Sequence, residues 1–390
     1  MKVRRCKVLY LEPREEVGFE LEMLLAGGNG LRRELGWIAL APHLGLEVGI
    51  DAAECALLGA LSPDEWIDGG TLAGHGALKS LLKKGLVVGT GKRHAAHRQS
   101  DEALRGAHWH PLSATVHAFT RWAVADAVQA MQDTGTETAG ELRQVLGAPP
   151  KETMERGYES RRIALPRTAR TDFDHLLARR ATCRNFDAER PLPYALFAQL
   201  IERVFAAQSQ VQVSDDTVFL KKTSPSGGGL HPVEAYLIVQ NVDGLAPGLY
   251  HYHATAHALE PLPLPEQSLH ELAMQAVAQQ DWFANAHVMV LMAPRYERSF
   301  WKYRNHAKAY RAITLEAGHL SQTLYLSATE AGLGAYITCA INEVPLERAF
   351  GLNPISEGAL AICGFGWRGV EMVTMELDPA GEVWRIENPS

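Results

Sequence analysis

The stretch KKTSPSGGGLHPVEAY, from Lys221 to Tyr236, places three consecutive glycines between two lysines and an apolar segment. Because glycine has no Cβ, such a run lets the backbone approach another group closely or take a left-handed conformation. Clusters of Ser, Pro and Gly are also common in ordinary turns. Taken alone, the stretch predicts a surface loop, and a more specific role depends on the residues that accompany it.

A second stretch, RATCRNF, directly follows an expected helix and has the residue types of an anion site. Arg180, Thr182 and Arg184 alternate along it, so an extended backbone would direct their side chains to one side. Two guanidinium groups and a hydroxyl suit the oxygens of a phosphate. The alternative interpretation is a solvated arginine-rich turn.

From about Ala169 onward the patterning predicts an α+β domain. Strands are expected where β-branched and aromatic residues cluster, and helices where apolar residues recur three and four positions apart. The expected strands are AYLIVQNV, GLYHYHA, HALEPL, HVMVLMA, GAYITCAI and ALAICGFGW, and the expected helices are DFDHLLARR, PYALFAQLIERVFAAQ and residues 307–331. Gly332 and Gly334 are expected to end the last of these helices.

Two further regions precede this domain. Residues 1–99 have a helix-turn-helix-strand order that predicts a winged helix, after the strand-like pieces KVLYL and GWIALAPHLGLEVGI. Leu78, Leu81 and Leu82 lie at helical spacing, and Gly85 has the position of a C′ glycine. Residues 100–168 predict a mainly helical linker region, in which PLSATVHAFTRWAVADAVQAMQ is the clearest periodic segment.

Composition excludes several classes of protein. A net charge of −7 over 390 residues argues against a dedicated nucleic-acid-binding protein, and the expected recognition helix LAGHGALKSLLKKG has no Arg or Asn to read base edges. Five separated cysteines without a C-x-x-C pair, and histidines without acidic partners, predict neither a disulfide framework nor a metal site. No apolar run is long enough for a membrane helix, so we expect a cytoplasmic protein without an anchor.

Four motifs in order resemble the flavin-dependent nitroreductase fold, and more closely its SagB-type branch, the azoline dehydrogenases of ribosomal peptide maturation. They are RRATCRNF, SPSGGGLHPVEAY, YRAITLEAGHLSQTLYLSATEAGLGA and ICGFG. The resemblance covers about 220 residues. It implies that residues 169–390 form an antiparallel-rich sheet flanked by helices, that the cofactor is FMN, and that the protein is a homodimer.

The resemblance also implies which residues hold the cofactor. Arg180, Thr182 and Arg184 match phosphate-binding positions, and the backbone around Ser226 would run beside the flavin ring. Thr323 departs from the branch, which often has an asparagine after Gln322. The full set of expected FMN-binding residues is Arg180, Thr182, Arg184, Ser226, Gly228, Gly229, Gln322, Gly332, Gly334 and Arg368, the last being the nearest candidate for a basic residue near the C-terminus.

The adjacent Lys302 and Tyr303, in SFWKYRNHAKAYR, resemble a pair that azoline dehydrogenases have and simple nitroreductases lack. Aromatization of an azoline requires a base, and a neighbouring cation can lower the pKa of either residue type. The alternative is the start of an amphipathic helix with one solvated lysine and one core tyrosine. If the pair is catalytic, we expect an irregular backbone between Trp301 and Arg304.

These observations favour an FMN-dependent dehydrogenase of peptide maturation, which oxidises an azoline to an azole or a related peptide bond. Its expected partners are a precursor peptide, whose leader the N-terminal domain would bind, and a cyclodehydratase. Two alternatives stay open: a general NAD(P)H-dependent flavin reductase of nitro compounds or quinones, and a non-catalytic peptide-recruiting or DNA-binding protein with a degenerate flavin fold.

Overall fold

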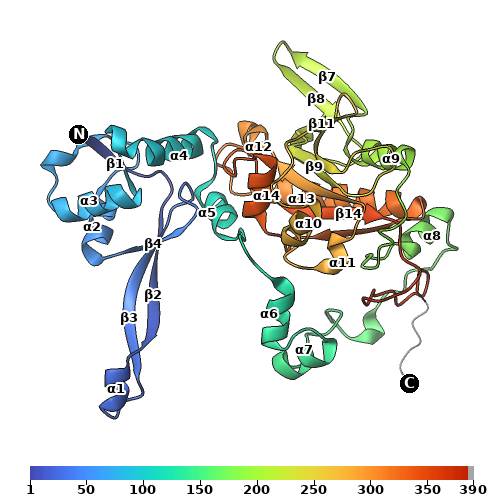
Figure 1. Cartoon of the computed structure of the whole chain (residues 1–390), viewed down its shortest axis with the longest axis horizontal. Helices are drawn as coiled ribbons and strands as arrows, with labels where there is room; N and C mark the ends of the chain where they lie inside the picture. The colour runs from blue at the N-terminus through green and yellow to red at the C-terminus, as the bar shows by residue number, and fades with distance from the viewer. Residues whose placement is uncertain (385–390) are drawn as a thin grey trace. The chain divides into compact units, whose positions relative to one another are not determined.

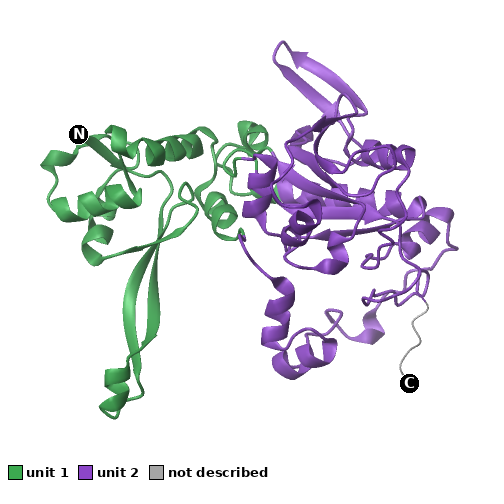
Figure 2. Cartoon of the chain, viewed as in Figure 1, with its two compact units in different colours: residues 1–121, 295–312, 353–357 green, residues 122–294, 313–352, 358–390 purple. Residues whose placement is uncertain are grey.

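The computed structural model describes residues 1–384, which form two compact units (Figures 1 and 2). The first unit comprises residues 1–121, 295–312 and 353–357. The second comprises residues 122–294, 313–352 and the described residues from 358 onward. Two short segments of the range 169–390 therefore belong to the first unit.

The first unit contains a small antiparallel sheet with the strand order β5-β1-β6. Its elements are β1 (Lys2–Arg5), α2 (Ala52–Ala60), β5 (Ile67–Asp68), η1 (Gly69–Thr71), α3 (His75–Lys84), β6 (Val87–Gly89), η2 (Lys92–His94) and α4 (Ala95–Gly106). Leu78, Leu81 and Leu82 of α3 are buried in its core, and Gly85 ends α3 at φ 78°, as predicted for a C′ glycine. The expected helix-helix-strand order is present in α2, α3 and β6, although η2 and α4 follow β6 instead of a second strand.

A long ribbon extends from this core (Figure 1). Strand β2 (Tyr10–Phe19) pairs with β3 (Leu31–Leu40), which pairs with β4 (Glu47–Ile50), and α1 (Leu21–Leu25) lies between β2 and β3. Ile38 and Ala39 are buried at the inner end, whereas residues 31–35 are exposed. The outer part of the ribbon has no buried face of its own.

Aromatic contacts join distant segments of the first unit. Trp109, just before α5 (Pro111–Phe119), stacks on His117 with ring centroids 5.2 Å apart. Tyr296 and Phe300 of α12 (Tyr296–Lys302) lie against Trp109 at 4.5 and 4.7 Å. Trp109 Nε1 donates to Ile355 O (2.8 Å). These contacts explain why residues 295–312 and 353–357 belong to this unit.

The second unit is built on a six-stranded sheet with the order β11-β10-β9-β12-β14-β13. All neighbouring strands are antiparallel, which confirms the predicted antiparallel α+β character. The strands are β9 (Val233–Val239), β10 (Gly248–His253), β11 (Ala258–Pro261), β12 (Val288–Pro294), β13 (Gly334–Thr338) and β14 (Ala361–Gly366). Each lies within one of the six expected stretches, apart from one or two end residues of β9 and β12.

Helices complete the second unit. They are α6 (Ala127–Thr134), α7 (Ala139–Leu146), η3 (Glu159–Arg161), α8 (Asp172–Arg179), α9 (Tyr194–Phe205), η4 (Gly227–Gly229), α10 (Leu269–Ala276), α11 (Asp281–Ala284), α13 (Ala309–Glu330) from Ile313 onward, and α14 (Glu343–Phe350), with the hairpin β7 (Ser209–Ser214) and β8 (Thr217–Lys221). Met289 and Leu291 of β12 pack in one core cluster with α10, α11 and α14. Every residue of β12 is buried, so both faces of the sheet are covered.

The structure corrects two local predictions. PLSATVHAFTRWAVADAVQAMQ is two helices, because α5 ends at Phe119 and α6 begins at Ala127. In the second unit, Ala125 N donates to Asn342 Oδ1 (2.7 Å), and the Asp126 side chain caps α6. KVLYL is mainly the connection between β1 and β2.

Two further properties concern the whole described chain. None of its helices has the length and apolar character needed to cross a bilayer. All five cysteines have free thiols.

The buried His117 makes the stability of the first unit depend on pH. Burial is the largest cause that lowers the pKa of His117 from 6.5 to about 3, while its hydrogen bond to Pro354 O (3.0 Å) opposes that shift. In the unfolded chain this imidazole takes a proton below about pH 6.5, so the free energy of unfolding should fall between pH 6.5 and 3, by up to about 1.4 kcal/mol per pH unit from this group.

Thermal unfolding of wild type and His117→Gln at several pH values tests this dependence. We expect the variant to be less stable at neutral pH but to lose less stability on acidification. The exposed His270 on α10 supplies the control, His270→Gln, which should keep the wild-type slope. Equal slopes in wild type and His117→Gln would contradict the assignment.

Candidate functional site

The segment from Arg180 to Arg184 is extended, as predicted. It follows α8, and Cys183 N donates to Ala335 O of β13 (2.9 Å). Ala181 and Cys183 are buried, whereas Arg180, Thr182 and Arg184 are half-buried. This alternation places the two arginines and the hydroxyl on the side of the strand that is open to a ligand.

Tyr325 of α13 lies beside two of these residues. Its hydroxyl is 3.1 Å from Thr182 Oγ1 and accepts a hydrogen bond from Ile337 N (3.1 Å). The Arg180 guanidinium carbon is 5.3 Å from the centre of the Tyr325 ring. Because Tyr325 can donate its proton to Thr182, the Thr182 hydroxyl hydrogen stays available for a ligand oxygen. No motif in the sequence predicts this role for Tyr325.

Glu376 holds the other end of the segment. This fully buried carboxylate accepts hydrogen bonds from Arg184 N (2.6 Å) and Asn185 N (2.9 Å). It also forms an ion pair with Arg368, whose guanidinium is 3.3 Å from Ala181 O. Arg368 therefore already has an anionic partner inside the protein, which makes it the least available of the expected phosphate ligands.

The glycine run forms the turn η4. Gly228 and Gly229 have φ angles of 67° and 68°, a region that strongly favours glycine. A Cβ at Gly229 would meet no atom closer than Phe219 Cδ1, at 4.0 Å. Backbone conformation, and not close packing against the protein, therefore requires glycine at this position. The Gly229 N–H donates to Ser226 O (3.1 Å) within the turn.

Residues of α13 fix this loop. Ser226 Oγ donates to Glu316 and accepts a hydrogen bond from His231 N (2.9 Å). Ser224 Oγ lies 2.7 Å from Thr323 Oγ1. Thr323, the departure from the family pattern, thus holds the loop through a hydroxyl.

Glu316 is buried against the glycine loop, where Val233 N also donates to it (3.3 Å). Burial raises the pKa of Glu316, and the Ser226 hydrogen bond opposes that shift. Glu316, His319 and Thr323 lie three and four positions apart, so they share one face of α13. This spacing is the signal in the sequence that places Glu316 beside the loop.

Three other expected site residues have simpler surroundings. Gly332 has φ 74° in the turn after α13. Gly334 begins β13 directly against Cys183, so a side chain there would collide with the Arg180–Arg184 segment. Gln322 is exposed on α13.

Lys302 and Tyr303 belong to the first unit, whereas all the expected cofactor-binding residues belong to the second. Helix α12 ends at Lys302, and Tyr303 leaves the helical conformation with ψ 46°. Asn305 follows with φ 52°. The expected irregularity is confirmed. Lys302 Nζ lies 5.6 Å from the centre of the half-buried Tyr303 ring, and Lys302 itself is exposed.

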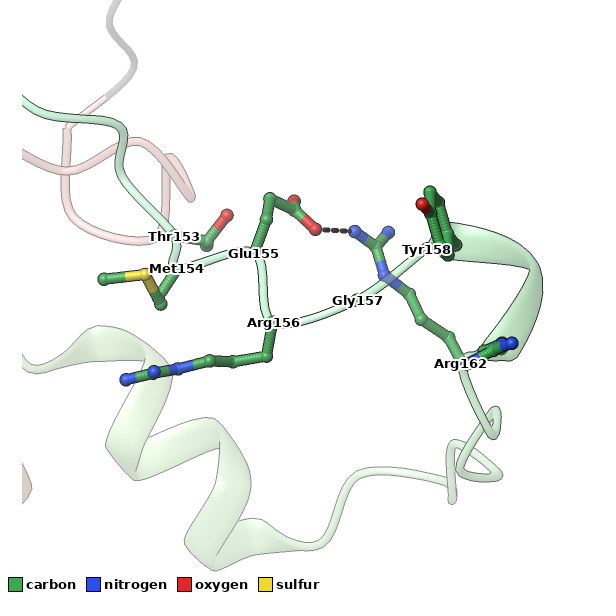
Figure 3. A pocket seen from close by; sticks show the side chains of 8 residues that line it. Thr153, Met154, Glu155, Arg156, Gly157, Tyr158 and Arg162 are labelled. Atoms are coloured by element: carbon green, nitrogen blue, oxygen red, sulfur yellow. Dashed lines mark hydrogen bonds and ion pairs between the residues drawn. The ribbon is translucent and has the colours of Figure 1, made fainter.

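A surface hollow of about 600 Å³ is lined by residues between Thr153 and Arg162 (Figure 3), and Arg162 pairs with Glu155 in it. It contains none of the expected site residues. Within residues 1–384, no cluster of His, Cys, Asp and Glu is arranged to hold a metal ion.

The second unit therefore has the donor chemistry for a phosphate-bearing cofactor. Two half-buried arginines and a hydroxyl supply charge-assisted and neutral hydrogen bonds to phosphate oxygens. The left-handed glycines supply a turn free of side chains. The residues present fit such a group.

Comparisons with known proteins agree with this arrangement. A model described as "Nitroreductase family" matches residues 177–367. The putative nitroreductase MJ1384 of Methanocaldococcus jannaschii is 33% identical over 172 residues, which cover 44% of this chain and 80% of the relative.

Two further relatives have names that refer to peptide processing. The trifolitoxin-processing protein TfxB of Rhizobium leguminosarum bv. trifolii is 29% identical over 44% of this chain and 47% of its own length. The microcin B17-processing protein McbC of Escherichia coli is 25% identical over 39% of this chain and 57% of its own length. The chain thus matches about half the length of each of these two proteins.

Arg184→Ala should lower the affinity for FMN. One charge-assisted phosphate contact contributes about 1.5–3 kcal/mol, so the dissociation constant should rise about 10- to 150-fold. Fluorescence titration of protein stripped of flavin measures this change. Arg179→Ala is the control, because Arg179 is an exposed residue of α8. Equal affinities for the two variants would exclude Arg184 as a phosphate ligand.

Proposed function

Because this chain belongs to the nitroreductase family, we propose that it is an FMN-dependent oxidoreductase that matures a ribosomally made peptide. Its substrate would be a peptide thiazoline or oxazoline, which it converts to the azole. The observation that carries the proposal is that the second unit contains both the Arg180–Arg184 segment and the left-handed glycine turn. The names of TfxB and McbC support peptide processing.

The cofactor would be held by the second unit. Arg180, Thr182 and Arg184 would bind its phosphate, and the backbone from Ser226 to Gly229 would run beside its ring. When bound, FMN supplies the oxidant that accepts a hydride from the substrate and passes the electrons to oxygen. Glu316 acts as a positioning residue, because it fixes Ser226 and the strand that begins at Val233.

The chain's own contribution to the chemistry would be proton removal. Aromatization takes a proton from one ring carbon and a hydride from the next, so a base must act on the substrate. Lys302 and Tyr303 are the proposed pair, and their proximity allows one to influence the other. An azoline is the product class of a cyclodehydratase, which is the expected partner enzyme.

A general NAD(P)H-dependent reductase of nitro compounds or quinones is the second candidate. MJ1384 supports it, since that relative is described as a putative nitroreductase. Such an enzyme would not need the first 165 residues. The third candidate, a non-catalytic peptide-recruiting or DNA-binding protein, is disfavoured by the intact set of Arg180, Ser226 and Gly228.

We also propose how the chain is divided into domains and how it assembles. Residues 1–99 would form a winged-helix-like domain that binds the leader of the precursor peptide, residues 100–168 a helical linker, and residues 169–390 the FMN domain of a cytoplasmic homodimer. Binding to nucleic acid or membrane is not proposed. In the first range, α2, α3 and β6 are the elements that support the winged-helix interpretation.

Lys302→Ala and Tyr303→Phe should each retain FMN. The rate of peptide oxidation should fall about 10²–10⁴-fold in each variant, which is the rate factor that general acid-base catalysis usually contributes. The measurement is the single-turnover loss of two hydrogens from an azoline-bearing peptide, followed by mass spectrometry. Lys308→Ala, which changes an exposed lysine after the same loop, is the control. Wild-type rates in both variants would remove the pair from the mechanism and favour the general reductase.

The C-terminal segment should contribute to a dimer. Val373, Met375 and Leu377 are 87%, 64% and 77% exposed, while Glu376 between them is buried, so one apolar side faces outward. Sedimentation should show a dimer that Val373→Glu with Leu377→Glu converts to monomer, and Val124→Glu, at another exposed valine, should not. A wild-type monomer with full flavin occupancy would contradict the dimer.

A further inference from the structure

A groove in the first unit runs along α3, beside η2 and the start of α4. Its volume is about 740 Å³. Leu78 and Leu82, each 7% exposed, form an apolar floor. The exposed Lys79, Lys83 and Arg93 line its rim. These two leucines belong to the core cluster, and the part of each that stays exposed lies under a basic rim, a combination that suits a recognition surface.

The cations of this rim have no counter-charge. The groove has no Asp or Glu in its lining, and within residues 1–384 Lys79, Lys83 and Arg93 form no ion pair. Lys84, by contrast, points to the buried Glu54, with Nζ and a carboxylate oxygen 2.6 Å apart. The charge of the rim is thus available to a partner, although the whole chain has a net charge of −7.

We propose that this groove binds an acidic amphipathic peptide segment, whose apolar side chains lie on Leu78 and Leu82 and whose carboxylates face Lys79, Lys83 and Arg93. This inference rests on the proposed function for the source of the segment, which is the precursor peptide. Helix α3 has ten residues and is about 15 Å long, so a segment of roughly ten residues in helical form would span the groove.

The neighbouring sheet edges are less suitable for binding a peptide as an added strand. Strand β5 has two residues, and β6 has three, all buried, with Gly89 O already accepting a hydrogen bond from Arg98. The ribbon strand β2 is longer but contains Pro13, which lacks an N–H. The groove therefore offers the peptide more apolar contact than these edges do.

A nucleic acid fits the groove less well than a peptide. Phosphates would meet the lysines, but nothing in a duplex backbone would cover Leu78 and Leu82. The basic rim and the apolar floor together favour a ligand that has acidic and apolar groups in one segment.

Fluorescence anisotropy with the full chain tests the proposal. The probe is a fluorescein-labelled peptide of about twelve residues of Leu and Glu, with leucines three and four apart so that they share one face. A second peptide has the same composition with the leucines dispersed. A labelled DNA duplex of about 20 base pairs is the third probe, since its phosphates supply a uniform negative charge without apolar side chains.

We expect the first peptide to bind about tenfold more tightly than the second peptide and the duplex. Lys79→Glu with Lys83→Glu should weaken that binding at least about tenfold, because attraction becomes repulsion at two rim positions. Lys151→Glu with Lys308→Glu makes the same change in net charge at two exposed lysines outside the groove and should retain wild-type affinity.

Three results would overturn the proposal: equal affinity for the two peptides, tighter binding of the duplex, or wild-type affinity in the Lys79→Glu and Lys83→Glu variant. FMN content and azoline oxidation, measured on the same preparations, separate this inference from the proposed function. Selective peptide binding without oxidation would contradict only the function. Oxidation without selective binding would contradict only the groove.

Discussion

The buried carboxylate of Glu316 is the constraint on which the candidate site depends. A carboxylate out of water is costly unless hydrogen bonds satisfy it. Its partners are Ser226 Oγ and Val233 N, at the two ends of the glycine loop. The two hydrogen bonds to Glu316 therefore fix the conformation of the loop. The left-handed glycines make that conformation accessible.

Local patterning accounts for what could be predicted of this fold. In each of the six strands of the large sheet, apolar and polar residues alternate or apolar residues form a short run. Both patterns can be recognised from a few consecutive residues. The direction of the Arg180, Thr182 and Arg184 side chains also depends only on an extended backbone. Gly85 could be placed because a left-handed C′ residue is a local requirement.

What could not be predicted depends on partners distant in sequence. Glu376 contacts Arg184 N, and Tyr325 contacts Thr182, across 192 and 143 positions. The break between α5 and α6 likewise depends on Asn342, which no periodicity in residues 111–132 encodes. The membership of residues 295–312 in the first unit follows from the contacts of Tyr296 with Trp109 and His117, which lie more than 170 positions away in the sequence.

The hydrogen bonds of Glu376 also determine when the site can form during synthesis. The N–H groups of Arg184 and Asn185 have no carboxylate to bind until residue 376 has left the ribosome. Earlier in translation the Arg180–Arg184 strand lacks the residue that fixes its far end, and β13 and β14 are also absent. Completion of the anion-binding segment therefore has to follow the synthesis of residue 376, and a phosphate-bearing cofactor would meet the finished segment only after that point.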